Sequence, residues 1–338
     1  MLSRGESEPL QPVYPVESPL RSSKFVIRDD DDLVLLRLLM GAEPTMLIVT
    51  AAELGLFDEL GTEKLTAKEL AKRANLDLRA TRIVLDGLVG LGLLRKNDDS
   101  YHNTPTALRH LRIHTDNGDA IRLWISGTRL WEKLPEILRT GRLPDHLAAH
   151  AWRYEQTENR VFSRSMYNFG WLTAQSVAET VDLSDIRHLV DLGGGPGHYA
   201  IAMLERYPGL RATVVDLPLT VAVARDTARR HGLEQRIDFV ASDLYTESCP
   251  LPPSCADVVL LSHVLHMEGP SQNAALIVRA SSLLVPGGRL IVHDLFLEEN
   301  QTDPGSSSMF AVNMLTMTER GEVYTSEDIA SWLSKRMF

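Results

Sequence analysis

The chain has 338 residues, 44% of them hydrophobic and 24% charged, which is the composition of a globular protein large enough for two domains. Its formal net charge of −10 argues against nucleic acid or an anionic membrane as a partner. We find no run of about 18 apolar residues and no apolar signal core at the N-terminus, so we expect a cytoplasmic protein without membrane association.

The N-terminal part begins with residues 1–28, which are rich in Pro, Ser and Glu and predict a disordered tail. Two apolar helices are predicted next, over Asp29–Met40 and Leu47–Leu60. Their Leu, Met and Ile content exceeds what one small module buries by itself. Two interpretations stand: an interface between two copies of the chain, or an ordinary core.

A winged-helix pattern follows and completes a predicted domain over residues 29–110. Thr66 and Glu69 form a capping-box signature that opens a helix to Ala74, and a second helix is predicted over Leu78–Leu93. Arg95–Asn103 predicts a hairpin. DNA binding is disfavoured, because the second helix carries two arginines and no basic stripe.

Residues 111–182 predict a helical linker between two domains, with helices within Asn117–Gly141 and Ala148–Val181. The stretch Arg160–Val181 predicts one long helix that joins the domains. Its Met and aromatic residues allow two interpretations, core packing or a cover over a ligand cleft.

Strands and helices alternate in residues 183–338, which predicts an α/β, Rossmann-like, doubly wound parallel sheet. The five predicted strands are Arg187–Leu192, Arg211–Leu217, Arg236–Ser242, Ala256–His263 and Arg289–Leu295. Each ends in polar residues, which are Asp191, Asp216, Asp243, Ser262-His263 and His293-Asp294. Because ligands of such sheets bind at the carboxyl ends of the strands, we expect a polar ligand there.

A glycine-rich turn links the first of these strands to a helix, with the spacing Asp191-x-Gly193-x-Gly195-x-Gly197. Glycine lets a ligand approach the backbone, and the helix N-terminus behind it favours an anionic group. The dinucleotide fingerprint also fits Gly195-x-Gly197-x-x-Ala200, but Pro196 removes a donor from that turn. A purely structural turn is the remaining alternative.

Six motifs in order carry a wider resemblance, namely VDLGGGPGHYA (190–200), VVDLP (214–218), SDLY (242–245), LLSHVLHMEGP (260–270), LVPGGRLIVHD (284–294) and FAVNML with GEVYT (310–325). With them, residues from about 30 to 338 resemble the two-domain O-methyltransferases of plant and bacterial secondary metabolism. The resemblance implies a winged-helix dimerisation domain, a Rossmann-like domain and S-adenosylmethionine as cofactor. We therefore expect a homodimer formed through the N-terminal helices.

The resemblance also implies roles for residues at the strand ends. Gly193, Gly195 and Gly197, after the acidic Asp191, face the methionyl part of the cofactor. Asp216 holds the ribose, with Leu217 beside the adenine, while Asp243 and Leu244 contact the adenine edge. Ser262 lies at the amino-acid end of the cofactor.

His266 aligns with the general base of the family, and Asp294 with an acidic residue that orients it. An imidazole suits this role because its reference pKa of about 6.5 lies near neutral pH. A hydrogen-bonded structural histidine is the alternative. His263 completes a His-x-x-His pair, but too few further ligands are predicted for a metal, and we expect none.

Two positions depart from the family pattern. The second acidic neighbour of the base aligns with Val323, beside Glu322, and the usual Asp-Trp after the histidine is Met267-Glu268. Family members also continue through a Gly-Phe turn into two more strands, so the resemblance implies a sheet that lacks its last strands, with reduced stability.

These observations favour an O-methyltransferase that acts on a hydroxyl of a small aromatic or polyketide-like metabolite. The candidate pocket residues are Met166, Phe169, Met309, Phe310, Asn313 and Met317. Two alternatives remain: a repurposed or inactive cofactor-binding relative of the hydroxylase or decarboxylase type, and a winged-helix regulator that senses a ligand.

Overall fold

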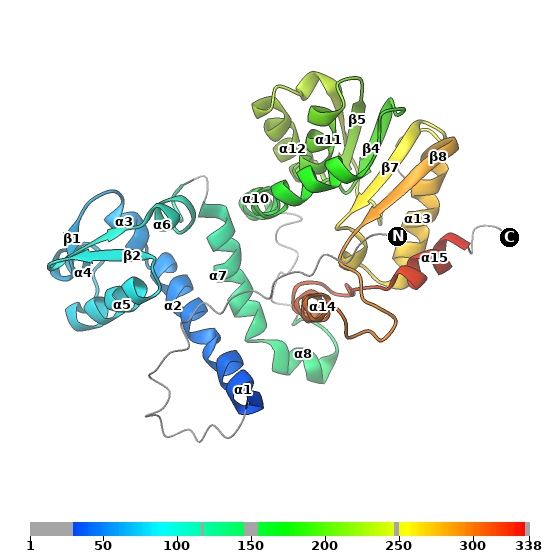
Figure 1. Cartoon of the computed structure of the whole chain (residues 1–338). Helices are drawn as coiled ribbons and strands as arrows, with labels where there is room; N and C mark the ends of the chain where they lie inside the picture. Colours follow the sequence, from blue (N-terminus) through cyan, green and yellow to red (C-terminus); the bar gives the residue numbers. More distant parts are fainter. Residues whose placement is uncertain (1–29, 116–117, 145–154, 247–249, 335–338) are drawn as a thin grey trace. The chain divides into compact units, whose positions relative to one another are not determined.

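The computed structural model describes residues 30–115, 118–144, 155–246 and 250–334, and Figure 1 labels its elements. The tail predicted over residues 1–28 lies outside the described residues. The chain divides into two compact units, residues 1–47 and 48–338.

The first unit contains α1 (Asp30–Met40) and the beginning of α2 (Ala42–Glu53). Several apolar residues of α1 are exposed, with Leu38 at 73% and Leu39 at 67% of their full accessible surface. These residues therefore form no core within the described part of the chain, which favours the interpretation as a contact with a second copy.

The stretch Val34–Glu53 corrects one expectation from the sequence. By length and composition it is apolar enough to cross a membrane, although we had expected no such stretch. A buried core helix or a signal sequence passes the same test, so this finding is weak evidence for a membrane span.

The winged-helix pattern is confirmed by α3 (Leu56–Leu60), α4 (Ala67–Arg73), α5 (Leu78–Gly90) and a sheet in the order β1-β3-β2. Its strands are β1 (Leu65–Thr66), β2 (Leu94–Asn97) and β3 (Ser100–Asn103). The capping box forms as predicted, because the Thr66 side chain accepts a hydrogen bond from the Glu69 N–H, and the Glu69 carboxylate accepts one from the Thr66 N–H.

Two predicted helices differ from the structure at glycines. The helix predicted over Leu47–Leu60 is broken, because Gly55 has a left-handed backbone (φ 70°) that separates α2 from α3. The helix predicted over Leu78–Leu93 ends at Gly90, since Leu94 already begins β2.

The residues between β3 and the C-terminal sheet are helical, with α6 (Pro105–His110), α7 (Asp119–Trp131), α8 (Leu134–Thr140) and the long α10 (Gln156–Thr180). α10 packs against α7, α11 and α12. It begins slightly earlier than the predicted helix over Arg160–Val181.

The C-terminal region forms a parallel five-stranded sheet in the order β6-β5-β4-β7-β8. The strands are β4 (His188–Leu192), β5 (Arg211–Asp216), β6 (Ile237–Ala241), β7 (Ala256–Ser262) and β8 (Leu284–His293). The connecting helices are α11 (His198–Arg206), α12 (Pro218–Arg230) and α13 (Pro270–Leu283), with short 3-10 helices at Glu234–Arg236 (η3) and Leu265–Met267 (η4). From β4 the chain adds β5 and β6 on one side and then β7 and β8 on the other, so the strand order reverses between β4 and β7. Such sheets bind ligands at this point.

Helices cover both faces of this sheet, as Figure 1 shows, with α10, α11 and α12 on one face and α13 and α15 on the other. Successive residues of β4 alternate between the two cores, so that Leu189 packs on the α11 side while Val190 and Leu192 pack on the α13 side. The doubly wound fold is therefore confirmed.

The last described elements are α14 (Gly305–Met317) and α15 (Ser326–Ser334). Thr325 caps α15, because its hydroxyl accepts from the Asp328 N–H at 3.2 Å. β8 begins at Leu284, earlier than the predicted strand at Arg289, and among the described residues it pairs with β7 alone.

Candidate active site

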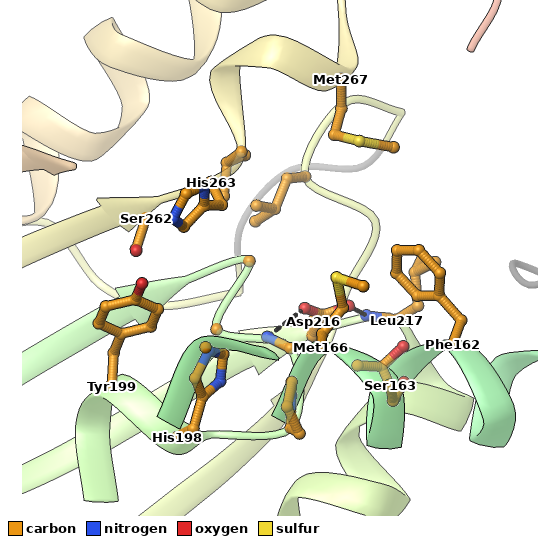
Figure 2. Close-up of a pocket in the computed structure, with 18 of the residues that line it drawn as sticks. Phe162, Ser163, Met166, His198, Tyr199, Asp216, Leu217, Ser262, His263 and Met267 are labelled. Atoms are coloured by element: carbon orange, nitrogen blue, oxygen red, sulfur yellow. Dashed lines mark hydrogen bonds between the residues drawn. The ribbon is translucent and has the colours of Figure 1, made fainter. Parts of the chain in front are cut away.

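A cavity of about 430 Å³ opens at the carboxyl ends of the strands, a size typical of small-molecule sites. α10 forms one wall, and the other lining residues lie at or after the carboxyl ends of β4 to β8 and in α14, which contributes Phe310. Figure 2 shows Asp216 and Leu217 on one side with Phe162 and Ser163, and Tyr199, Ser262 and His263 on the other.

The glycine-rich turn after β4 contributes backbone to this cavity. Gly193 has a φ of 71°, and a Cβ built on it would lie 2.6 Å from Val264 Cγ2. At Gly194 a Cβ would lie 2.7 Å from the carboxylate of Asp191. Glycine is therefore required at both positions, and the backbone stays open to a ligand.

Asp191 lies beneath this turn and does not line the cavity. Burial, together with the nearby negative charge of Asp216, raises the pKa of Asp191 to about 7. Gly197 also lies outside the lining, at the N-cap of α11. These two predicted cofactor residues therefore border the glycine turn without lining the cavity.

The other cofactor residues predicted from the strand ends all line the cavity. They are Gly193, Gly195, Asp216, Leu217, Asp243, Leu244 and Ser262. The carboxylate of Asp216 accepts from the Gly195 N–H at 2.8 Å and from the Leu217 N–H at 2.7 Å. Asp243 accepts from the Tyr245 N–H at 3.0 Å. Two carboxylates are thus held at the ends of neighbouring strands β5 and β6.

The lining contains buried polar atoms that have no hydrogen-bond partner among the described residues. Ser163 Oγ, His198 Nδ1 and Ser242 Oγ are among them. Such atoms are rare in folded proteins because each loses its hydration without compensation. Their gathering around one cavity indicates a polar ligand that supplies the missing bonds.

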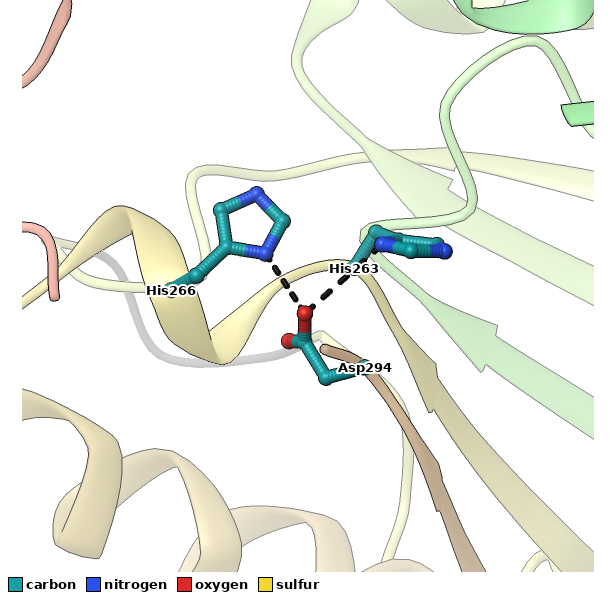
Figure 3. A group of neighbouring side chains, drawn as sticks. All are labelled: His263, His266 and Asp294. Carbon is teal, nitrogen blue, oxygen red and sulfur yellow. Dashed lines mark hydrogen bonds and ion pairs between the residues drawn. The ribbon is translucent and has the colours of Figure 1, made fainter. Parts of the chain in front are cut away.

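His266 lies in η4, directly after β7, and its Nδ1 lies 2.7 Å from Asp294 Oδ1. His263 directs its own Nδ1 toward the same oxygen at 3.6 Å, as Figure 3 shows. Both histidines line the cavity, whereas Asp294 is behind them and 5% of its side chain is exposed. The predicted pair of His266 and Asp294 is therefore brought together.

The two histidines near Asp294 counteract the effect of burial on its pKa. Burial alone would raise the pKa of Asp294, but the hydrogen bond and charge of His266, together with His263, hold that pKa below its ordinary value. Burial lowers the pKa of His263 to about 4. An ionised carboxylate therefore faces two imidazoles.

The turn that carries His266 is tied to α13 by a buried amide. Asn273 Nδ2 donates to Leu265 O at 2.7 Å and to Glu268 O at 2.9 Å. The Tyr324 hydroxyl also donates to Glu268 O, at 2.5 Å. The Phe310 ring stands edge-on to His266 with ring centroids 4.9 Å apart. The imidazole is thus fixed on several sides.

The candidate pocket residues divide into two groups. Met166, Phe169 and Phe310 line the cavity, whereas Met309, Asn313 and Met317 do not. Met309 is 57% exposed, and Asn313 Oδ1 accepts from Trp131 Nε1 at 3.2 Å. Asn313 also lies 3.4 Å from the Met317 sulfur, so α14 presents Phe310 to the cavity and turns the other three away.

Sequence reasoning left several lining residues unassigned. They include Phe162, Ser163, His198, Tyr199, His263, Met267 and Leu295. His198 and Tyr199 follow the glycine turn directly, so their position at the start of α11 could have predicted that they line the cavity. At the position of the family's second acid, Val323 is buried, and the adjacent Glu322 is exposed.

Comparison with known proteins agrees with this geometry. An O-methyltransferase domain model matches residues 131–338, and an O-methyltransferase dimerisation domain model matches residues 36–112. The chain is 32% identical over 310 residues to the tetracenomycin polyketide synthesis 8-O-methyl transferase TcmO of Streptomyces glaucescens, covering 90% of each. It is also 32% identical to 3-hydroxy-5-methyl-1-naphthoate 3-O-methyltransferase of Streptomyces sahachiroi, covering 89% of this chain and 87% of that one.

Among solved structures, human N-acetylserotonin methyltransferase in complex with S-adenosylmethionine is similar, with a TM-score of 0.74 and 26% identity. The match covers 92% of this chain and 93% of that chain. The two domain models match in chain order, and these relatives cover about nine tenths of the chain. The chain belongs to the O-methyltransferase family, as an S-adenosylmethionine-dependent methyltransferase of secondary metabolism with the dimerisation domain of that family.

Proposed function

We propose that this enzyme methylates a hydroxyl of a small aromatic or polyketide-like metabolite, with His266 as the general base and Asp294 as the residue that positions it. The observation that carries the proposal is the 2.7 Å contact between His266 Nδ1 and Asp294 Oδ1 at the wall of the cavity. The two relatives from Streptomyces act on polyketide or naphthoate compounds by their names, which supports an aromatic acceptor.

The residues around the cavity fit S-adenosylmethionine. Carboxylates such as Asp216 and Asp243 offer acceptors for ribose hydroxyls and amine groups. The unpartnered Ser163 and Ser242 hydroxyls can form hydrogen bonds with polar groups of the cofactor. The glycine turn lets the cofactor approach the backbone closely. When bound, the cofactor supplies an electrophilic methyl group on a sulfonium.

His266 has the geometry of a base. Its Nδ1 is engaged by Asp294, so the other ring nitrogen remains to accept the proton of an acceptor hydroxyl. The ionised carboxylate then stabilises the imidazolium that forms. Methyl transfer is a direct displacement, so the further task of the protein is to hold the two reactants in line.

The acceptor side of the cavity is apolar. Met166, Phe169, Met267, Leu295 and Phe310 contribute to its lining. Such a surface favours a flat aromatic compound and excludes water from the reacting oxygen.

We further propose that three segments of the chain have separate roles, as the sequence predicts. Residues 29–110 would carry dimerisation, residues 111–182 would cover the acceptor, and residues 183–338 would bind the cofactor. Support comes from the exposed leucines of α1 and from α10, which provides Met166 and Phe169 to the cavity.

The test combines cofactor titration with methyl transfer. Wild-type protein is titrated calorimetrically with S-adenosylmethionine and then incubated with methyl-labelled cofactor and a panel of phenolic, polyketide and amine acceptors. We expect labelled product from phenolic or polyketide acceptors, and we expect His266→Ala to lower kcat by roughly 10²–10⁴-fold at unchanged cofactor affinity.

Other outcomes point to the alternatives. Cofactor binding without transfer to any acceptor would favour a repurposed relative, and transfer to amines alone would correct the acceptor atom. Unchanged turnover in His266→Ala would remove this histidine from the role of base.

A further inference from the structure

Gly170 of α10 and His198 at the start of α11 pack against each other in the wall of the cavity. A Cβ built on Gly170 would lie 2.4 Å from His198 Nε2 and 2.8 Å from its Cδ2. The imidazole therefore occupies the space that any other side chain at position 170 would fill. Glycine is unfavourable inside a helix, so its place in α10 is explained by this ring.

The His198 imidazole is polar yet buried, with 7% of the residue exposed. Its Nδ1 has no hydrogen-bond partner among the described residues. Burial, aided by the nearby His263 and His293, lowers the pKa of His198 to about 3, so the ring is neutral at physiological pH. A neutral imidazole offers one donor and one acceptor, and the described residues supply no hydrogen-bond partner for Nδ1.

The position of this ring in the cavity indicates which part of a ligand it meets. Asp216 and Leu217 lie on one side with Phe162 and Ser163, whereas His198 lies on the side of Tyr199, with Ser262 and His263 across from it (Figure 2). Under the proposed function, on which this step rests, the ribose lies at Asp216. The amino-acid end of the cofactor then extends past the glycine turn toward His198.

We propose that His198, for which Gly170 makes room, is a cofactor-binding residue whose imidazole hydrogen-bonds the amino-acid end of S-adenosylmethionine. That end carries a carboxylate and an ammonium group, which match the donor and the acceptor of a neutral imidazole. An uncharged ring also adds no positive charge near the sulfonium.

The experiment compares three ligands by calorimetric titration. S-adenosylmethionine and S-adenosylhomocysteine contain the amino-acid end, whereas 5′-methylthioadenosine keeps the nucleoside and the sulfur but lacks that end. We expect His198→Ala to weaken the first two by about tenfold to a hundredfold, as for loss of a hydrogen bond to a charged group, and to leave methylthioadenosine within about twofold.

A second substitution tests the same contact without changing the histidine. Gly170→Ala displaces the ring and should produce the same selective loss, and it should add no further loss in the His198→Ala background, where the ring is gone. Gly127→Ala is the matched control, because Gly127 is also inside a helix (α7) and a Cβ there meets nothing within 4 Å.

The outcomes separate this inference from the proposed function. If wild-type protein binds all three ligands and His198→Ala binds them equally well, or loses all three to the same degree, the role of His198 is overturned. A wild-type protein that binds none of the three would overturn the proposed function as well.

Discussion

His266 and Asp294 follow the carboxyl ends of two neighbouring parallel strands, β7 and β8, and their side chains meet at 2.7 Å. The same carboxylate oxygen accepts from the Leu295 N–H at 2.9 Å, which fixes its orientation. The parallel pairing of Ser262 with His293 sets the positions of both residues. This arrangement gives the imidazole a defined direction before any ligand is bound.

Replacing Asp294 tests that arrangement. We expect Asp294→Asn to lower kcat roughly tenfold to a thousandfold, because the charge that stabilises the imidazolium is lost while the size of the side chain is kept. The affinity for S-adenosylhomocysteine and the KM for the cofactor should stay near wild type. Steady-state kinetics and calorimetry measure both, and a change in cofactor affinity alone would contradict a positioning role.

The carboxyl group of Asp191 predicts a pH-dependent stability. Its pKa rises from an ordinary value of 3.8 to about 7 in the folded chain, so the folded state holds the proton more tightly than the unfolded state. The resulting penalty is absent below about pH 4, grows as pH rises toward 7, and is complete above 7.

Asp191→Asn should therefore raise the melting temperature at pH 8, by an amount equivalent to at most about 4 kcal/mol, and have little effect near pH 4. Thermal unfolding without ligand at several pH values measures this difference. Asp238→Asn is the control, because the Asp238 side chain, on β6 of the same sheet, is 68% exposed and should show no such trend. An Asp191→Asn effect that is equal at all pH values would refute the explanation.

Asn273 is expected to stabilise the turn that carries His266. Asn273→Leu leaves Leu265 O and Glu268 O without this amide donor, so it should cost about 2–3 kcal/mol of stability and reduce kcat more than cofactor affinity. Urea unfolding and kinetics test both effects. The adjacent, half-buried Gln272→Leu is the control and should remain within about 0.5 kcal/mol of wild type.

The exposed leucines of α1 predict the oligomeric state. We expect Leu38→Glu combined with Leu39→Glu to convert a dimer into a monomer, because charge placed in an apolar contact loses its hydration. Sedimentation velocity measures the mass. Leu138→Glu on α8, where Leu138 is 72% exposed, should leave the mass unchanged. A wild-type monomer would refute the dimer.

The polar residues at the strand ends were predictable from the sequence because a parallel sheet brings the carboxyl ends of its strands to one edge. Asp216, Asp243 and Ser262 therefore line one cavity as expected. The pairing of His266 with Asp294 followed from the same rule, since β7 and β8 are neighbours.

Pocket residues on α14 were less predictable, because the rotation of a helix about its axis is set by tertiary contacts. Phe310 faces the cavity while the adjacent Met309 is exposed, and the bond from Trp131 holds Asn313 elsewhere. The proposed role of His198 was also not predictable from the sequence, because only the folded chain brings Gly170 of α10 next to its imidazole.

Asp216 has a consequence for binding energetics. Its two oxygens already receive the Gly195 and Leu217 N–H groups, so the rotamer of this side chain is selected before a nucleoside arrives. In the proposed role of Asp216 at the ribose, association then loses little conformational entropy at this residue, and more of the interaction remains as net affinity. A carboxylate that became ordered only on binding would bind the same ribose hydroxyls more weakly.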